Sequence, residues 1–331
     1  MKVLIIRLSS FGDILQTLPA ISALHDSGST VSYLTKKNFS SLVRTHPKLE
    51  SVIELQGKGT LKDLWETAQS IDSQNFTHIY DAHNNLRSLL LKVFLITLGF
   101  FRFKTYIILT RSKQRWKRFL FFKLHQPVFN MPFKGALSYL APLKRWNITS
   151  TPKDQTHLFL PLSHVPLPEK PFITLAPSAA WKTKRWPENY WIDLIQASPE
   201  KHFVLLGGAE DHFIERIHKA SPRNTVNMAG RLNLIESCYY IKNSSLLISG
   251  DTGLLHAADQ LHHPCIALIG PTAFGYPLHR TSEVLETQLP CKPCSKDGRN
   301  PCSNTIYQKC LIDIHPHIVI QKVNTILGRT P

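Results

Sequence analysis

The chain has 331 residues, of which 43% are apolar and 19% charged, and this composition excludes fibrous and intrinsically disordered proteins. The length predicts two domains of about 150 residues each, and the formal net charge of +16 indicates an anionic partner. The first apolar run is too short for a secretion signal, and no segment has the ~18 apolar residues of a membrane-spanning helix. We therefore expect a cytoplasmic protein.

The first half of the chain alternates strand and helix patterns. Such alternation predicts βαβ units around a parallel sheet. The run KVLIIRL is apolar throughout, as in a strand buried on both faces. Strands are predicted at 2–8, 30–35, 51–55, 77–81 and 105–110, and helices at 13–25, 38–46, 60–71 and 86–98.

A long basic stretch follows the fourth predicted strand. Between Asp81 and Asp154 there is no acidic residue, but there are 14 Lys or Arg and 13 aromatic residues. Basic and aromatic side chains together are typical of contacts with phospholipid headgroups or with nucleic acid. A basic, solvated surface over an ordinary core is the alternative interpretation.

The second half begins after a linker. Residues 147–170 are rich in Pro, Ser and Thr and show no helical period. Alternation then resumes, which predicts a second doubly wound domain, and we place the boundary between residues 155 and 156. Strands are predicted at 171–178, 201–208, 225–230, 244–250 and 263–272, with helices from about 187, 211 and 252 and around 234–241.

The loop after the first strand reads SSFGD. A strand-to-helix loop at this position often holds a phosphate, but this one has a single glycine, Gly12, instead of a glycine fingerprint. The carboxylate of Asp13 would repel a phosphate. We therefore predict that the loop points Asp13 toward a ligand, while Ser9 and Ser10 hydrogen-bond to the ligand or to the loop. The alternative is that Asp13 only stabilises the first turn of the helix.

Three loops of the second half are suited to a nucleotide sugar. In GDTG, the helix amides after Gly253 form an anion site, Asp251 can accept sugar hydroxyls, and His256 shares the helical face of Thr252. The alternative is that Asp251 or Thr252 only caps the helix, with His256 on its surface.

The other two loops follow the first two strands of this half. The turn at Ser178 precedes Lys184, which suits phosphate oxygens, and Glu210 follows two glycines where an acid can hold a ribose. An exposed basic loop and an ordinary acid in a first helical turn are the alternatives. There is no GxxxxGK[ST] motif, which argues against ATP hydrolysis.

Six cysteines are present, and four of them cluster near the C-terminus. Cys291, Cys294, Cys302 and Cys310 include a CxxC pair, which in a cytosolic protein is a weak candidate for a structural zinc site. Their spacing matches no standard zinc finger or ribbon. Free thiols or one labile disulfide are the alternatives, so no metal is assigned.

These motifs, in this order, resemble the bacterial heptosyltransferases of glycosyltransferase family 9. The resemblance rests on SSFGD, PSAAWKTKRWP, GDTGLLHAAD, ALIGPT and CKPC with two later cysteines, and it covers residues 2 to about 319. It implies a GT-B fold, with two doubly wound Rossmann-like domains facing across a cleft. It also implies transfer of heptose from ADP-heptose to the inner core of lipopolysaccharide, with no cofactor required for the chemistry.

The resemblance also implies roles for individual residues. Asp13 matches the general base, in a loop near the acceptor that includes Ser9, Ser10 and Gly12. One departure from the family pattern is Ala179 and Ala180, where Thr or Gly is common. The donor-binding positions, of which Glu210 has Asp211 as a rival, are Ser178, Lys184, Glu210, Met228, Asp251, Thr252, Gly253 and His256.

The expected reaction is a single displacement that inverts the anomeric carbon. The expected partners are a phosphorylated glycolipid acceptor and the anionic inner face of the inner membrane, where a monomer would bind peripherally. Candidate contacts to acceptor or membrane are Arg87, Lys113, Arg115 and Arg118, beside Lys117 and Trp116. A transferase with another nucleotide sugar or acceptor is the nearer alternative, and a nucleic-acid-binding protein the more distant one.

Overall fold

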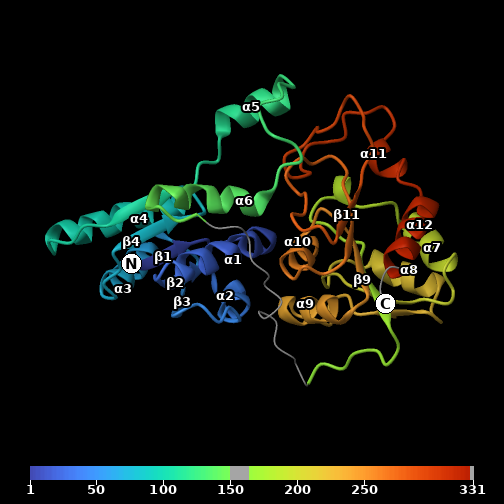
Figure 1. Ribbon diagram of the computed structural model, residues 1–331, viewed down its shortest axis with the longest axis horizontal. Helices are drawn as coiled ribbons and strands as arrows, with labels where there is room; N and C mark the ends of the chain where they lie inside the picture. Colours follow the sequence, from blue (N-terminus) through green and yellow to red (C-terminus); the bar gives the residue numbers. More distant parts are fainter. Residues whose placement is uncertain (150–163, 329–331) are drawn as a thin grey trace. The chain divides into compact units, whose positions relative to one another are not determined.

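The computed structural model describes residues 1–149 and 164–328. The chain divides into two compact units, each built on one parallel sheet (Figure 1). The first unit comprises Met1–Arg115 and Ala136–Leu158, and the second comprises Trp116–Gly135 and Phe159–Pro331. The prediction of two parallel α/β sheets is confirmed.

The first sheet has the strand order β3-β2-β1-β4-β5. Its central strand β1 pairs with β2 on one side and with β4 on the other, so Val3 lies between Val31 and His78. The order reverses between β1 and β4, which is where ligands bind in sheets of this kind. The strands are β1 (Lys2–Ile6), β2 (Thr30–Thr35), β3 (Ser51–Glu54), β4 (His78–Asp81) and β5 (Ile107–Thr110).

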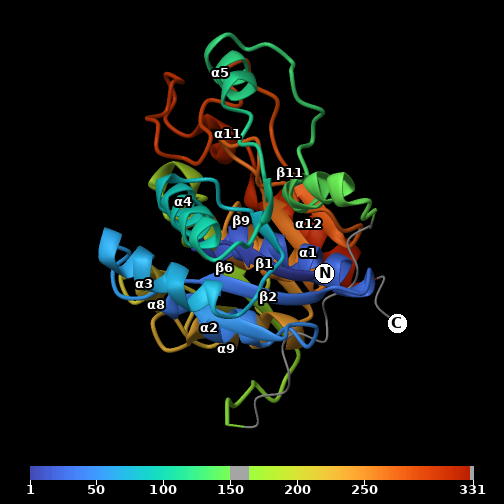
Figure 2. The same ribbon diagram turned by 90° about the vertical axis from the view of Figure 1, so that its left-hand side faces the viewer.

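Helices cover both faces of this sheet. Helices α3 and α4 lie side by side (Figure 2) and contribute Leu64, Leu91 and Leu95 to a core shared with Leu4 and Ile6. Capping boxes at Thr60 and Asn85 fix where these two helices begin. The helices are α1 (Phe11–Asp26), α2 (Lys37–Arg44), α3 (Leu61–Asp72), α4 (Leu86–Phe101), α6 (Gly135–Leu140) and the 3₁₀ helix η1 (Ala141–Trp146).

The second sheet repeats this order with one more strand, β11-β10-β9-β6-β7-β8. Here the order reverses between β6 and β9, and the loops after these two strands carry most of the predicted donor residues, whereas Glu210 follows β7 and Met228 follows β8. The strands are β6 (Phe172–Ala176), β7 (His202–Leu205), β8 (Thr225–Asn227), β9 (Leu246–Gly250), β10 (Cys265–Leu268) and β11 (Ser282–Leu285).

Helices of the second unit enclose a core around the fully buried Trp191. The ring of Trp186 meets that of Trp191 edge to face, and the Trp186 Nε1–H donates to the Ile314 carbonyl at 2.8 Å. The helices are α5 (Arg115–Lys123), α7 (Glu188–Gln196), α8 (Phe213–Ala220), α9 (Leu234–Asn243), α10 (Gly253–Gln260), α11 (Lys309–Ile312), α12 (Pro316–Leu327) and the 3₁₀ helix η2 (Lys182–Lys184).

One segment differs from the predicted domain division. Residues 116–135 were expected in the first domain, but they group with the second unit. The reason is aromatic packing: Phe121, Phe122, Phe129 and Phe133 all have ring centroids within 6.3 Å of the Phe274 ring. The predicted boundary at 155/156 lies outside the described residues.

All ten predicted strands and all eight predicted helices overlap observed ones. Strand β11 and helices α5, α6, α11 and α12 were not predicted, because their segments are short or lack a clear period. Within the described parts of the chain, no helix is long and apolar enough to cross a membrane.

Candidate functional site

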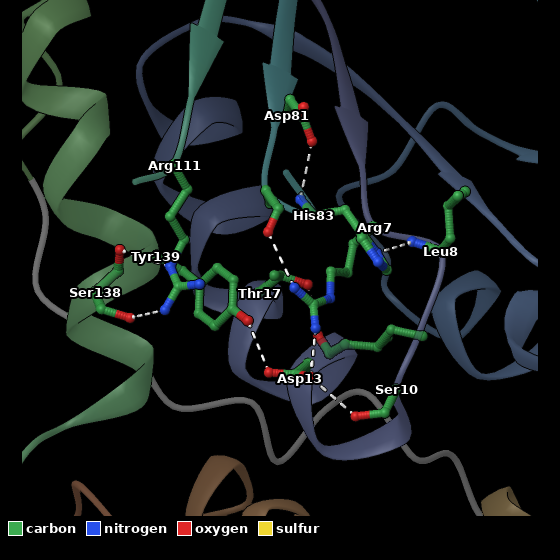
Figure 3. Close-up of polar contacts among 12 residues, drawn as sticks. Arg7, Leu8, Ser10, Asp13, Thr17, Asp81, His83, Arg111, Ser138 and Tyr139 are labelled. Carbon is green, nitrogen blue, oxygen red and sulfur yellow. Dashed lines mark hydrogen bonds and ion pairs between the residues drawn. The ribbon is translucent and has the colours of Figure 1, made fainter. Parts of the chain in front are cut away.

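The loops after β1 and β4 meet at the point where the order of the first sheet reverses (Figure 3). Arg7 donates from Nη1 to the Ala82 carbonyl at 3.1 Å, and the Leu8 N–H donates to His83 Nδ1 at 3.1 Å. The buried carboxylate of Asp81 holds the β4 loop by accepting from the His83 N–H at 3.0 Å. These hydrogen bonds join the two loops into one platform.

Asp13 lies in the first turn of α1, on this platform. Its Oδ2 receives the Ser10 hydroxyl at 2.9 Å and forms an ion pair with the Arg7 guanidinium (Figure 3). Its Oδ1 accepts the Tyr139 hydroxyl at 2.9 Å. Ser10 is the N-cap residue of α1 but bonds to Asp13 instead of to a helix amide. The Asp13 side chain is 41% exposed, whereas Arg7 is buried.

Tyr139 is held in place by a second arginine. The Arg111 guanidinium lies 3.9 Å from the centroid of the Tyr139 ring and donates from Nη2 to the Ser138 hydroxyl at 2.6 Å. This places two guanidinium groups, those of Arg7 and Arg111, around one tyrosine and one carboxylate. The local charge is positive.

This surrounding charge sets the protonation states. Burial raises the pKa of Asp13, but the Arg7 charge and the hydrogen bonds from Tyr139 and Ser10 outweigh it and lower the pKa to about 2. Burial and the charges of Arg7 and Lys113 lower the pKa of His83 to about 4. At neutral pH Asp13 is therefore ionised, and His83 is uncharged with its proton on Nε2, because Nδ1 accepts from Leu8.

In the second unit, the loops after β6 and β9 meet at the corresponding point. Lys184 Nζ lies 2.9 Å from Asp251 Oδ2, the same oxygen that accepts the Thr272 hydroxyl at 2.7 Å. His256 Nε2 lies 3.8 Å from Asp251 Oδ1. The structure thus brings together three predicted donor residues, Lys184, Asp251 and His256, and adds Thr272.

The electrostatics resemble those around Asp13. Burial raises the pKa of Asp251, but the charges of Lys184 and His256 and the Thr272 hydrogen bond lower it overall. His256 is buried, so it is not a residue of the helix surface. Thr252 does cap α10, since its hydroxyl accepts from the Leu255 N–H. The amides that begin α10 point outward beside these residues.

Two glycines allow this close approach. A Cβ on Gly250 would lie 2.9 Å from the Lys184 carbonyl oxygen, and a Cβ on Gly275 would lie 2.0 Å from the Asp251 carboxylate. Real Cβ contacts are not this short, so each glycine is required where it stands. The loop containing Gly275 therefore fixes the position of Asp251.

The cysteine-rich tail supports the Lys184 turn. The Gln308 side chain donates to the Lys182 carbonyl at 2.6 Å, and Thr183 donates to the Gly298 carbonyl. A Cβ on Gly298 would lie 2.7 Å from the Lys184 side chain. The tail is thus part of the wall around the predicted phosphate lysine.

The four tail cysteines are free thiols, and all four are among the residues that line one small cavity of about 10 Å³. Burial raises the pKa of Cys294 and of Cys310. Across residues 1–149 and 164–328, no group of three or more His, Cys, Asp or Glu side chains is arranged to hold a metal ion.

The remaining predicted donor residues lie nearby in the second unit. Ser178 is half-buried in the turn after β6, and Glu210 is exposed after β7. Its rival Asp211 accepts from the Gly208 N–H at 2.9 Å and pairs with Arg185 at 3.2 Å, so Asp211 already serves the fold. The Met228 N–H donates to the Leu205 carbonyl, and the Met228 carbonyl accepts from the Arg231 N–H at 3.1 Å, so a contact to a ligand would use its second lone pair. Gly253 begins α10.

Residues of the SSFGD loop and the basic segment are placed as follows. Gly12 is the second residue of α1, and it is not among the described glycines with a positive φ. Ser9 is half-buried, and Arg87 is exposed on α4. Arg118 stacks its guanidinium 4.7 Å from the Phe274 ring, so it helps to hold the aromatic cluster. Lys113 is half-buried before α5, whereas Arg115, Trp116 and Lys117 are exposed.

Sequence reasoning missed Arg7, His83, Arg111 and Tyr139. A signal existed for two of them, because Arg7 and His83 follow strands that were predicted correctly. Had the strand order been known, the loop after β4 would have been recognised as the neighbour of the SSFGD loop. Tyr139 comes from a distant segment with no periodic pattern, so nothing local pointed to it.

The profile of glycosyltransferase family 9 (heptosyltransferase) matches residues 64–302. The chain belongs to this family. Its match to lipopolysaccharide heptosyltransferase 1 of Pseudomonas aeruginosa is 25% identical and covers 89% of this chain and 86% of that protein. Its match to lipooligosaccharide heptosyltransferase 2 of Haemophilus influenzae is 30% identical, and the chain spans about half of that protein's length, 49%.

Solved structures of family members show the same fold. The ADP-heptose LPS heptosyltransferase II of Escherichia coli superposes with a TM-score of 0.72 at 18% identity, covering 99% of both chains. Escherichia coli heptosyltransferase WaaC with ADP gives a TM-score of 0.71 at 17% identity, covering 98% of this chain and all of that one, 100%. The predicted GT-B fold class is therefore confirmed.

The Gly275 contact leads to a test of the predicted donor site. In Gly275→Ala the new methyl group displaces the Asp251 carboxylate from Lys184. We expect ADP to bind about 10-fold to 100-fold more weakly, as for the loss of one hydrogen bond to a charged group. Isothermal titration calorimetry with ADP measures the change.

The matched control is the same substitution in an Asp251→Asn background. If Gly275 acts through Asp251, the double variant binds ADP about as well as Asp251→Asn alone, because coupled sites are not additive. Full additivity of the two effects would show that Gly275 acts on something else.

The lowered pKa of Asp13 leads to a prediction about acid stability. A carboxyl group with a folded-state pKa of about 2 and an unfolded value of about 3.9 stabilises the fold fully above pH 4 and loses this effect as the pH falls toward 2. The difference in unfolding free energy between the wild type and Asp13→Asn should therefore be constant above about pH 5 and shrink below pH 4. Urea unfolding followed at each pH measures it. A difference that grows on acidification would contradict the Arg7–Asp13 pairing.

Proposed function

We propose that this protein transfers a heptose from ADP-heptose to the inner-core and lipid A acceptor of lipopolysaccharide, with inversion at the anomeric carbon. Family membership and the heptosyltransferase relatives support the transfer of heptose. The observation that carries the proposal is an ionised, half-exposed carboxylate, Asp13, held by three hydrogen-bonding or charged partners at the sheet switch point.

The chemistry requires one base and one stabilised leaving group. The acceptor hydroxyl attacks the anomeric carbon as the bond from that carbon to the diphosphate breaks, and the hydroxyl proton passes to the base. A single displacement inverts the centre and needs no second carboxylate as nucleophile. The leaving ADP gains negative charge, so fixed cations and amides stabilise the transition state.

Asp13 is suited to accept the proton at one particular oxygen. A carboxylate has about four lone-pair positions. Arg7 and Ser10 both bind Oδ2, whereas Oδ1 accepts the Tyr139 hydroxyl. We therefore assign Oδ1 as the atom that takes the acceptor proton. The Arg7 pairing makes Asp13 a weaker base but keeps it ionised at every physiological pH.

The second unit would hold the donor. Lys184 Nζ has three N–H donors, and its contact with Asp251 leaves others for phosphate oxygens. The N-terminal amides of α10 add a second group of donors for the diphosphate. Asp251 and His256 would contact the heptose, Glu210 the ribose and the Met228 carbonyl the adenine, while Ser178, Thr252 and Gly253 shape the phosphate turn.

The acceptor is a phosphorylated glycolipid, so we propose that the protein acts peripherally at the cytoplasmic face of the inner membrane, as a monomer. The segment without acidic residues would contact anionic groups of the acceptor or of the lipid. Arg87, Lys113 and Arg115 are its candidates for this contact.

Replacement of the base tests the mechanism. Asp13→Asn keeps the shape of the side chain but removes its basicity, so turnover should fall by about 10²-fold to 10⁴-fold, the usual contribution of a general base. Steady-state transfer to a purified acceptor measures kcat. ADP affinity should be unchanged, because the predicted donor contacts lie in the other unit. A folded Asp13→Asn protein with near-wild-type turnover would exclude the base assignment.

The donor is tested by a thermal-shift screen with ADP-, UDP-, GDP- and CMP-sugars. A ligand that binds only the folded protein stabilises it by about 2.7 kcal/mol when present at 100 times its Kd. ADP-heptose should give the largest rise in Tm, and Lys184→Gln should reduce that rise. A larger rise with a sugar of another nucleotide would overturn the donor assignment.

A further inference from the structure

Helix α4 presents an apolar face to solvent. Five side chains at spacings of three and four residues lie along one side of the helix, as the helical period requires. Each of these residues is between 47% and 77% exposed, which is unusual for a row of large apolar side chains. This α4 face consists of Leu86, Leu89, Val93, Ile96 and Phe100.

The opposite side of α4 already has its partners. Leu91, Leu95 and Leu98 are buried in the core of the first unit, and Phe94 packs edge to face on Trp65 of α3. The exposed row is therefore not needed to attach the helix to its own unit. It is a second apolar surface.

The end of the helix adds two more exposed aromatic side chains. Phe101 is 74% exposed and Phe103 is fully exposed, at 100%. The helix closes with a Schellman motif, in which the Lys104 N–H donates to Gly99 at 2.8 Å and the Phe103 N–H to Phe100 at 3.4 Å. Phe103 occupies the left-handed position of this motif, with a φ of +54°, where glycine is the usual residue.

A phenylalanine at this position lowers the stability of the fold. A bulky residue in the left-handed region is strained, and this side chain gains no burial in return. The backbone of Phe103 closes the helix, but its ring is fully exposed and adds no burial to the fold. This exposure indicates a contact made with something outside the chain.

The charges around this surface indicate an anionic partner. Helix α4 has no acidic residue and exposes Arg87, whereas its Lys92 is buried and pairs with Asp81. Arg102 and Lys104, which follow the helix, share one buried carboxylate, that of Asp72, so a net positive charge remains at this end of the helix. Two copies of the helix packed face to face would bring arginine against arginine in either direction, and the nearby carboxylate of Asp72 is buried and already paired. Anionic lipid headgroups supply the missing negative charge.

We propose that the α4 face, together with Phe101 and Phe103, inserts into the headgroup region of an anionic membrane. Helix α4 would lie along the bilayer surface, as amphipathic helices with a basic border do. This inference rests on the proposed function, because it supplies the surface by which the enzyme would reach a membrane-bound acceptor. The sequence predicted the apolar contact with the membrane near Trp116 in α5, whereas this proposal places it on α4.

Vesicle binding tests this surface. Sucrose-loaded vesicles of phosphatidylcholine, alone or with about 30 mol% anionic phosphatidylglycerol, are sedimented with the full-length protein. The wild type should bind the anionic vesicles more tightly. The double variant Ile96→Gln/Phe100→Gln should lower the partition coefficient at least about tenfold, because it removes two buried apolar contacts. Glutamine is a good helix former, so the helix should persist.

A second variant separates membrane binding from folding. Phe103→Gly removes the exposed ring and relieves the left-handed strain. Vesicle binding should fall several-fold while Tm stays the same or rises. The matched control is Val226→Ser in strand β8, which truncates a 45% exposed apolar residue away from α4 and should leave vesicle binding unchanged.

Several outcomes would overturn the proposal. Variants of the α4 face that bind vesicles like the wild type would exclude it as the lipid surface. A wild-type dimer in analytical ultracentrifugation that Ile96→Gln/Phe100→Gln dissociates would show that a second copy covers the face. An equal loss of binding in Val226→Ser would show that the effect is not specific to α4.

An assay of heptose transfer distinguishes failure of the α4 proposal from failure of the proposed function. Transfer to a deacylated, soluble acceptor does not need a membrane, so the α4 variants should retain full turnover with it. Loss of vesicle binding with retained turnover supports both proposals. Vesicle binding by a wild-type protein that transfers no heptose would leave the α4 surface standing and would reject the proposed activity.

Discussion

Each unit has a carboxylate paired with a cation at the point where its strand order reverses. In the first unit this is Asp13 with Arg7, and in the second it is Asp251 with Lys184. Parallel order forces this arrangement, because the carboxyl ends of β1 and β4, and of β6 and β9, meet at one edge of each sheet. The glycines, hydroxyls and aromatic rings around each pair are placed by that meeting of loops.

The two pairs differ in what they leave accessible. Asp251 is buried and shares an oxygen between Lys184 and Thr272, so it is fixed on both sides by its neighbours. Asp13 is bound at one oxygen by Arg7 and Ser10 and remains 41% exposed. Buried ion pairs contribute little net stability, since desolvation offsets attraction, so their geometry matters more than their strength. One pair is suited to hold a ligand and the other to react with one.

Much of this could be predicted from the sequence because strands and helices leave periodic patterns. The apolar run at 2–8 and the alternation after residue 171 were sufficient for two doubly wound sheets, and the SSFGD and GDTG loops, predicted as site loops, follow strands at which the order of each sheet reverses. Tyr139 could not be assigned to Asp13, because a contact over 126 residues of chain depends on how the whole unit folds. The α5 segment was placed in the wrong unit, because packing of four phenylalanines on Phe274 has no periodic signal.

Residues 116–135 belong to the second unit, although the segments before and after them belong to the first. The chain therefore passes between the units three times, not once. A hinge made of one linker permits many rotations, whereas three crossings permit only those that all three can follow. It also means that neither unit is a contiguous module: division of the gene at the linker would deprive Phe274 of its aromatic neighbours. A rotation of one unit would therefore be limited by the three covalent connections that join it to the other unit.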